Sequence, residues 1–415
     1  MSAGPKSIQA LEDIDQIEKV WEREKRQIAE RRHPNDFPAL PSVPVSRYVD
    51  PVFFEIEKQH LWRKTWVLAG FSNEIEKPGS YKSLDIAGSP IFILRDDQGD
   101  IRAFHNACQH RGTAVCLKPQ GQVERFRCPY HGWTYDLAGQ LIHVPQEHEF
   151  PGLDRHQKGL KPLRCERLGN LIFVSFDENA PALAAYLEDL AELWTDVPFD
   201  RVELHETVSM EMNCNWKCVH DNFNETYHVP SVHPKTVHVA LDFRCHAKHL
   251  FKNGYSAMYT KIRGGKDSGL YRSGGAEIST LKPLTAYSSR AYCVFPSLVM
   301  PVADNVFTII ESVPITVSRS RLNVHFMKIT GTAGVDLEAL AREAVAVFKP
   351  IAEEDAFLLE YTQKSMAGGG LDAISLSYSE QFLYNYQLEI DNIIGRDNIP
   401  ERYRVGIVEL PLKNR

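Results

Sequence analysis

Residues 108–133 read CQHRGTAVCLKPQGQVERFRCPYHGW, and this stretch contains two short arms of metal-binding side chains. The first arm is Cys108-x-His110, and the second arm, which begins 17 residues after the first one ends, is Cys128-x2-His131. Each arm therefore offers one thiolate and one imidazole. Two arms of this mixed kind predict a metal centre that is held by two cysteines and two histidines.

The mixed pairing matches a Rieske [2Fe-2S] centre, in which two thiolates bind one iron and two histidines bind the other. A structural zinc site is the alternative, although zinc sites more often take two cysteines from one arm and two histidines from the other. Gly112 and Gly132 closely follow the two histidines, and glycine there lets backbone N–H groups approach the cluster sulfides. Cys116 lies between the arms, and we expect it to be a small buried apolar side chain rather than a ligand. The sequence therefore predicts a Rieske centre.

A second dense stretch, residues 215–233, reads NWKCVHDNFNETYHVPSVH. If residues 217–228 form a helix, Asp221, Glu225 and His228 share one face, because side chains four and three residues apart are neighbours on a helix. A proline two residues later is expected to end this helix. The stretch therefore places one histidine beside two carboxylates.

His233 follows that proline and is expected to turn back beside His228. Two histidines need one carboxylate to complete a 2-His-1-carboxylate facial triad, which is the site of non-haem Fe(II) oxygenases. Glu353, Glu354 and Asp355 lie in a late helical segment that also carries apolar residues. The periodicity of that segment does not choose among the three acids. Three further histidines downstream are expected to be surface or supporting groups: His238, His246 and His249.

The composition is that of a globular protein with two or three domains. The chain has 415 residues, 43% hydrophobic and 24% charged, with a formal net charge of -7. The acidic balance argues against a general nucleic-acid binder. The sequence contains no apolar run of transmembrane length and no signal peptide. Its eight cysteines are too few for a disulfide scaffold in a chain of this length. We therefore expect a cytoplasmic protein without a membrane anchor.

Hydrophobic periodicity predicts an α+β fold. The segment 66–177 consists of short β-like runs separated by turn signals, and later segments alternate between strand and helix patterns. Helices are predicted at 8–32, 181–194, 337–366 and 380–394. Strands are predicted at 205–212, 291–302, 305–315 and 322–329. The segment 264–283, which is rich in Gly, Ser and Lys, is predicted to be a mobile loop.

Together these residues resemble the catalytic α subunits of Rieske non-haem iron ring-hydroxylating oxygenases, over roughly residues 62–394. The resemblance implies that the cluster is held by Cys108, His110, Cys128 and His131. It also implies that the mononuclear iron is held by His228, His233 and Asp355. Asp355 is the acid that matches the family pattern Glu-Asp followed by an apolar, glutamine-containing helix.

The family also places an acid three residues before the first iron-binding histidine, and here that residue is Glu225. In the family this acid connects an iron histidine to a cluster histidine of the neighbouring subunit. Many ring dioxygenases have aspartate at this position, whereas a branch that oxidises or demethylates quaternary ammonium compounds often has glutamate. The residue therefore indicates, without deciding, the second branch.

The resemblance implies an all-β Rieske domain and a helix-grip (START-like) catalytic domain with an antiparallel sheet, assembled as a head-to-tail homotrimer. We expect residues 66–177 to form the Rieske domain and residues 178–415 the catalytic domain, with residues 1–65 as an N-terminal helix and connection that belong to the catalytic domain. Whether a small β subunit takes part stays open.

The implied activity is that of the terminal component of a multicomponent mono- or dioxygenase, an oxidoreductase of EC class 1.14. The chain has no Gly-x-Gly-x-x-Gly motif after a predicted strand, so electrons from NAD(P)H are expected to come from a separate reductase or a ferredoxin. The expected substrate is a hydrophobic, aromatic small molecule, oxidised with O2 in aromatic compound catabolism. Oxidative demethylation of a quaternary ammonium or other N- or O-methyl compound is the alternative, and a pure electron-transfer Rieske protein is a further one.

Overall fold

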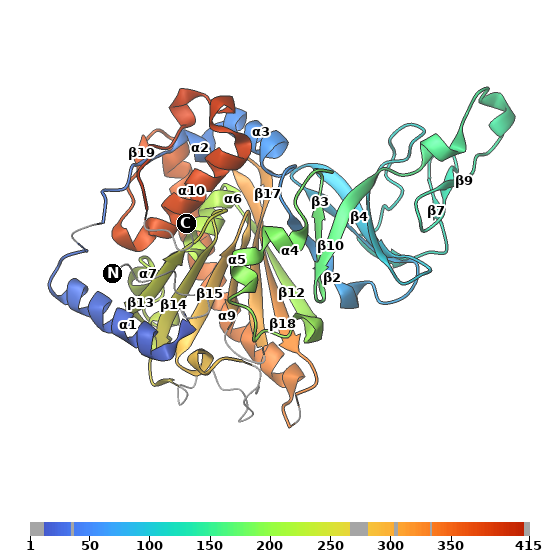
Figure 1. Ribbon diagram of the computed structural model, residues 1–415. Helices are drawn as coiled ribbons and strands as arrows, with labels where there is room; N and C mark the ends of the chain where they lie inside the picture. The colour runs from blue at the N-terminus through green and yellow to red at the C-terminus, as the bar shows by residue number, and fades with distance from the viewer. Residues whose placement is uncertain (1–11, 35–36, 266–280, 303–305, 333, 411–415) are drawn as a thin grey trace, which may run out of the picture. The chain divides into compact units, whose positions relative to one another are not determined.

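The computed structural model describes residues 12–34, 37–265, 281–302, 306–332 and 334–410 (Figure 1). The chain forms two compact units, one of residues 62–186 and one of residues 1–61 together with 187–415. Helices and antiparallel sheets occur in the chain, which confirms the predicted α+β class. In the part of the chain that the structure describes, no helix is both long and apolar enough to cross a membrane.

The smaller unit is built on an antiparallel seven-stranded sheet with the order β2-β11-β10-β5-β4-β3-β6. Its strands are β2 (Val67–Phe71), β3 (Ser80–Ile86), β4 (Ser89–Arg95), β5 (Ile101–His105), β6 (Gln120–Gln122), β10 (Pro162–Leu168) and β11 (Leu171–Ser175). A second, three-stranded sheet consists of β7 (Phe126–Arg127), β8 (Thr134–Tyr135) and β9 (Leu141–His143). The core of this unit includes Phe92, Phe104, Trp133 and both cysteines of the two arms. The predicted metal-binding arms thus lie on loops that begin and end in this core.

The larger unit is built on one antiparallel seven-stranded sheet with the order β12-β18-β17-β16-β15-β14-β13. Its strands are β12 (Val202–Met212), β13 (Leu241–Leu250), β14 (Ser256–Ile262), β15 (Ser288–Val294), β16 (Leu298–Val302), β17 (Val306–Thr316) and β18 (Arg319–Ile329). Apolar side chains from one face of the sheet, such as Met258, Ile310 and Val324, form a core with α6 (Trp216–Phe223) and α9 (Leu337–Ala367). One face of the antiparallel sheet thus packs against α6 and α9, as expected for a helix-grip catalytic domain.

The other helices of the larger unit are α1 (Ile14–Ala29), α2 (Ser46–Val49), α3 (Pro51–His60), α5 (Glu188–Ala191), α7 (Val229–Val232), α8 (Val237–Ala240) and α10 (Gln381–Ile394). The short helix α4 (Leu183–Tyr186) belongs to the smaller unit, where it contacts β10. A two-stranded sheet pairs β1 (Val43–Pro44) with β19 (Ala373–Ile374). The helix α1 lies along β13 (Figure 1) and buries Ile17 and Trp21, so its apolar stripe covers its own unit.

The predicted elements mostly occur, with three differences. The helix predicted at 181–194 is divided into α4 and α5, and the strand predicted at 291–302 is two strands separated by a turn at 295–297. The N-terminal helix begins at Ile14 rather than at residue 8, where the chain lies outside the described residues. Most of the loop predicted at 264–283, residues 266–280, also lies outside them.

Candidate metal centres

The two arms of the first centre have the same local backbone. The N–H of Gly112 donates to the carbonyl of Cys108 at 2.8 Å, and the N–H of Gly132 donates to the carbonyl of Cys128 at 3.0 Å. Both glycines have positive φ angles, 81° and 75°, which a residue with a Cβ atom rarely adopts. The glycines therefore have a role that the sequence reasoning missed, because they close a tight left-handed turn behind each cysteine.

The side chains of the arms approach one another. The cysteine side chains are buried, at 2% and 3% exposure for Cys108 and Cys128, and the rings of His110 and His131 have centroids 4.5 Å apart. The Tyr135 hydroxyl lies 3.2 Å from the Cys108 sulfur and accepts the N–H of Gln109 at 2.9 Å. Burial raises the pKa of the Cys108 thiol, and the thiol of Cys128 raises it further.

These residues fit a Rieske centre. Nδ1 of His110 is buried and has no hydrogen-bond partner among the described residues, which is the situation of a ligand atom. Its ring stacks on Trp133 with centroids 4.9 Å apart, whereas His131 is exposed, so the histidine side of the site is nearer to solvent than the cysteine side. Cys116 is buried in the same core, where burial raises its pKa to about 12, so the prediction of a small apolar role is confirmed.

The second stretch is not one helix. The helix α6 begins after Asn215, whose side chain accepts the N–H of Lys217, and it ends at Phe223 instead of reaching residue 228. The prediction of a shared helical face for Asp221, Glu225 and His228 is therefore wrong. The chain leaves the helix at Asn224 and makes an irregular turn, and His228 then stands at the start of α7.

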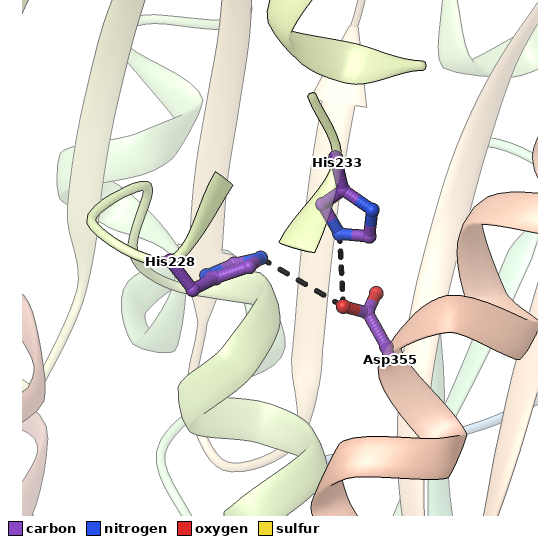
Figure 2. Close-up of side chains that lie close together, drawn as sticks. All are labelled: His228, His233 and Asp355. Carbon is purple, nitrogen blue, oxygen red and sulfur yellow. Dashed lines mark ion pairs between the residues drawn. The ribbon is translucent and has the colours of Figure 1, made fainter. Parts of the chain in front are cut away.

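Figure 2 shows that His228, His233 and Asp355 nevertheless point toward one another. One ligand atom from each of the three residues lies within 4.8 Å of the others. Asp355 Oδ1 is 2.9 Å from His233 Nε2 and 3.8 Å from His228 Nε2. Both carboxylate oxygens of Asp355 are buried, and apart from the contacts of Oδ1 with the two histidines they have no partner among the described residues, so a cation would complete this group.

The three candidate acids of α9 face three different environments. Asp355 is 2% exposed and joins the two histidines, whereas Glu353 is exposed. Glu354 Oε2 lies 2.6 Å from His233 Nδ1 and accepts the Thr236 hydroxyl at 3.0 Å. Burial lowers the pKa of His233, but contacts with Asp355 and Glu354 outweigh this effect, so its pKa is raised overall. The supporting role of Glu354 was missed in the sequence, where only its place beside Asp355 signalled it.

Glu225 supports the other histidine. Its Oε1 forms an ion pair with His228 Nδ1, and its Oε2 accepts the backbone N–H groups of Tyr227 and His228. Both imidazoles therefore have a carboxylate at Nδ1 and present Nε2 to Asp355. A carboxylate at the outer nitrogen fixes the orientation of a metal-binding imidazole and raises its basicity.

Asp221, the rival to Glu225, makes a different contact. Its Oδ2 accepts the Tyr48 hydroxyl at 2.6 Å, and the same hydroxyl accepts an N–H from Gln387 at 2.9 Å. Burial raises the pKa of Asp221 to about 7. The downstream histidines were expected to be surface or supporting groups. His246 and His249 are only 4% and 8% exposed, so these two do not lie at the surface.

Comparisons with known proteins agree with both centres. Residues 65–161 match the Rieske [2Fe-2S] domain, and residues 199–396 match the ring hydroxylating alpha subunit (catalytic domain). Taken together, the two matches cover more than half of the chain.

Individual relatives were found in both oxygenase branches. The chain is 34% identical over 202 residues to a glycine betaine monooxygenase oxygenase subunit of Pseudomonas aeruginosa, a match that covers 49% of this chain and 47% of the relative. It is 32% identical over 232 residues to a benzene 1,2-dioxygenase subunit alpha of Pseudomonas putida, covering 54% and 51%. These matches thus span about half the length of the curated relatives.

A solved structure shows the same fold over nearly the whole chain. Naphthalene 1,2-dioxygenase from Rhodococcus sp. superposes with a TM-score of 0.73 at 22% identity, covering 91% of this chain and 97% of that one. In this chain the Rieske match precedes the catalytic-domain match. The chain belongs to the family of Rieske oxygenase α subunits, in which a Rieske [2Fe-2S] domain precedes a ring-hydroxylating catalytic domain.

Proposed function

We propose that this chain is the terminal oxygenase component of a multicomponent Rieske oxygenase, which oxidises a small organic molecule with O2 and electrons derived from NAD(P)H. The observation that carries this proposal is the convergence of His228, His233 and Asp355, whose ligand atoms lie within 4.8 Å of one another. Two imidazoles and one carboxylate form the facial triad of non-haem iron oxygenases, which leaves positions open for O2.

The two cofactors would be held by separate sets of residues. Cys108, His110, Cys128 and His131 would hold a [2Fe-2S] cluster, and His228, His233 and Asp355 would hold one Fe(II). Bound there, the two groups would supply one-electron storage and activation of O2. Three observations support this allocation: the mixed thiol and imidazole arms, the buried His110 Nδ1 without a hydrogen-bond partner among the described residues, and the buried Asp355 carboxylate, which contacts only the two histidines among those residues.

The protein's own contribution at the second site is orientation. Glu225 and Glu354 hold the Nδ1 side of His228 and His233, so that each Nε2 points toward Asp355. The burial of Asp355 and His233 restricts water at this side of the site. A fixed triad in a partly dry setting keeps the open positions in one place relative to a bound substrate.

Glu225 is proposed to connect two subunits in a head-to-tail homotrimer. Its carboxylate already holds His228, and it would also accept an N–H from His110 of the partner subunit, which shortens the electron route between the two centres. Electrons would come from a separate NAD(P)H-dependent reductase or a ferredoxin, because the sequence has no dinucleotide-binding motif of its own.

Two substrate classes are considered, and a specific observation favours each. Relatives named benzene 1,2-dioxygenase support oxidation of a hydrophobic aromatic compound. Relatives named glycine betaine monooxygenase, together with glutamate rather than aspartate at position 225, support oxidation of an N-methyl compound with loss of the methyl group. In both cases the enzyme is an oxidoreductase of EC class 1.14.

The test combines metal analysis with a substrate screen. Protein purified under anaerobic conditions should be red-brown and contain about two irons and two sulfides for the cluster and about one further iron per chain. Coupled NADH oxidation with an added reductase, followed by mass spectrometry of products, should identify the substrate. A colourless protein with stoichiometric zinc would overturn the proposal, and a cluster without substrate-dependent O2 uptake would support an electron-transfer protein instead.

A further inference from the structure

A cavity of about 970 Å3 opens beside His228 in the larger unit. Residues from the 226–231 turn, from the segment 238–246 and from Arg263 form most of its wall. The lining residues are Ile28, Thr226, Tyr227, His228, Pro230, Ser231, His238, Asp242, Phe243, Arg244, His246, Arg263 and Ser379. This volume suits a small organic molecule next to the candidate iron site.

The wall of the cavity carries more positive than negative side chains. One carboxylate, Asp242, lies between two guanidinium groups. Arg244 donates to it through Nε and Nη2, both at 2.8 Å, and Arg263 Nη2 lies 3.6 Å from it. Hydrogen bonds from Arg244 lower the pKa of Asp242 to about 2, so this carboxylate is charged at neutral pH. The three side chains together therefore carry one net positive charge.

Of the two arginines, Arg263 makes the longer contact with Asp242. Its Nε donates to the backbone carbonyls of His238 and Leu241, both at 3.1 Å, and these bonds hold the guanidinium in place. Asp242 is engaged in two close hydrogen bonds with Arg244, and its contact with Arg263 is longer than a hydrogen bond. A fixed guanidinium with N–H donors left over is a suitable partner for a planar anion.

Among the described lining residues, the rest of the wall carries no further lysine, arginine, aspartate or glutamate. The ring of His238 stacks on Phe243 with centroids 5.0 Å apart, and His238 Nδ1 is buried without a hydrogen-bond partner among the described residues. The ring of His246 lies beside the hydroxyls of Thr226 and Thr260, and burial lowers its pKa far enough to keep it neutral. The arginine pair is therefore the cationic feature among the described lining residues.

We propose that this cavity is the substrate site and that it receives a small molecule with a carboxylate, which pairs with Arg263 while Arg244 and Asp242 fix the local charge. The inference rests on the proposed oxygenase function, which it deepens by naming a chemical class. The class includes acids from both substrate groups above, aromatic acids and carboxylated N-methyl compounds, and excludes neutral hydrocarbons and alcohols as good ligands.

The experiment compares carboxylates with alcohols of similar shape that lack the carboxylate. Benzoate is paired with benzyl alcohol, and glycine betaine is paired with choline, which keeps the quaternary ammonium group but has a hydroxyl in place of the carboxylate. Dissociation constants are measured on the anaerobic, iron-loaded enzyme by calorimetry, and O2 uptake with reductase is measured in parallel. At least one acid should bind roughly 10- to 100-fold more tightly than its partner, as expected for a charge-assisted pair with a guanidinium.

Variants identify the residue responsible. Arg263→Gln should weaken binding of that acid about 10-fold or more and change binding of the matched alcohol less than about twofold. Arg263→Lys should recover part of the loss, because it keeps the charge but not the planar donors. Arg321→Gln, at an exposed position on β18 outside the cavity, is the matched control and should change neither.

The outcomes separate this inference from the proposed function. Equal or tighter binding of the alcohols, or unchanged acid binding in Arg263→Gln, would overturn the carboxylate site. If compounds without a carboxylate are then oxidised with O2 uptake, the oxygenase function stands while the carboxylate inference fails. If acids bind as expected but no compound on any screen is oxidised, the proposed function fails while the binding site stands.

Discussion

Each histidine of the mononuclear site has a carboxylate at its Nδ1 atom, and the two carboxylates come from different distances along the chain. Glu225 is three residues from His228, and both its oxygens are held within the same short turn, by the His228 ring and by backbone N–H groups. Glu354 comes from α9, 121 positions along the chain from His233, and it is anchored by the Thr236 hydroxyl. One pair is therefore local, whereas the other exists only because α9 packs beside the 228–236 segment.

This difference bears on what each pair can do. The Glu225 side chain is 10% exposed and that of Glu354 is 37% exposed, so both carboxylates retain some access to solvent or to a partner molecule. Glu225 stays in place as long as its turn is formed. Glu354 also depends on the position of the helix that carries Asp355, so it links the orientation of one ligand to the placement of another.

The largest effect is expected when Asp355, which the histidines of both pairs face, is removed. Asp355→Ala deletes the group that both Nε2 atoms face, so turnover should fall below detection and the mononuclear iron should be lost. Iron analysis and the visible spectrum of the cluster measure this, and the cluster spectrum should stay unchanged. Glu353→Ala, which changes an exposed acid two positions earlier on α9, is the matched control. Loss of iron in Glu353→Ala or Glu354→Ala, with iron retained in Asp355→Ala, would show that the wrong acid was chosen.

Glu225→Gln tests whether the local pair carries more than orientation. With iron supplied in excess, the variant should keep both metals and its oligomeric state yet lose nearly all turnover, because the proposed route to His110 of the partner subunit needs an acceptor for two imidazoles. The measurement is a single turnover of chemically prereduced enzyme, with cluster reoxidation followed in the presence of substrate and O2. Rapid reoxidation in this variant, or a matching defect in Asp221→Asn alone, would remove Glu225 from the electron path.

Glu354→Gln tests the pair that depends on tertiary structure. Loss of the anionic partner at His233 Nδ1 should weaken Fe(II) binding by roughly 10- to 100-fold, which is typical for residues that support metal ligands. Equilibrium dialysis against Fe(II), with the cluster intact, measures this affinity. Glu353→Gln should bind iron like the unaltered protein. Equal affinities for Glu354→Gln and Glu353→Gln would show that the contact has no influence on the metal.

The smallest expected effect comes from Asp221, and it is a change in the stability of the fold with pH. Its pKa is about 7 in the folded chain, above the ordinary value of about 4 for aspartate, so the folded state binds the proton more tightly than the unfolded state does. The stabilisation is therefore fully present below about pH 4 and is lost as the pH rises toward 7. The melting temperature of the unaltered protein should fall relative to that of Asp221→Asn between pH 5 and pH 7, by calorimetry. Parallel curves would show that Asp221 does not titrate in this range.

The fold class and the long elements could be predicted because their patterns are local and repeated. The strands β12, β17 and β18 and the helices α9 and α10 lie close to the expected ranges. The sequence pattern did not predict where the helix in the polar stretch 215–233 ends. The helix α6 stops at Phe223, although Asp221, Glu225 and His228 have helical spacing, because the chain turns there to bring His228 and Glu225 together.

The sequence by itself determined the two arms at 108–131 and the pair His228 and His233. These residues are close in the chain, so short turns are sufficient to bring their ligand atoms together. It also determined, through resemblance, which late acid to expect.

Only the tertiary structure decided how three consecutive acids divide their roles. Successive residues on a helix point about 100° apart, so Glu353 faces solvent, Glu354 reaches Nδ1 of His233 and Asp355 reaches Nε2 of both histidines. Which of these directions faces the histidines depends on how α9 is rotated against the sheet, and that rotation is set by core packing of α9 that includes Ala352 and Ala356 on either side of the acids. A separate core cluster, which contains Val229, Phe243 and Ile262, places Arg263 at the cavity beside His228, which no spacing in the sequence indicates.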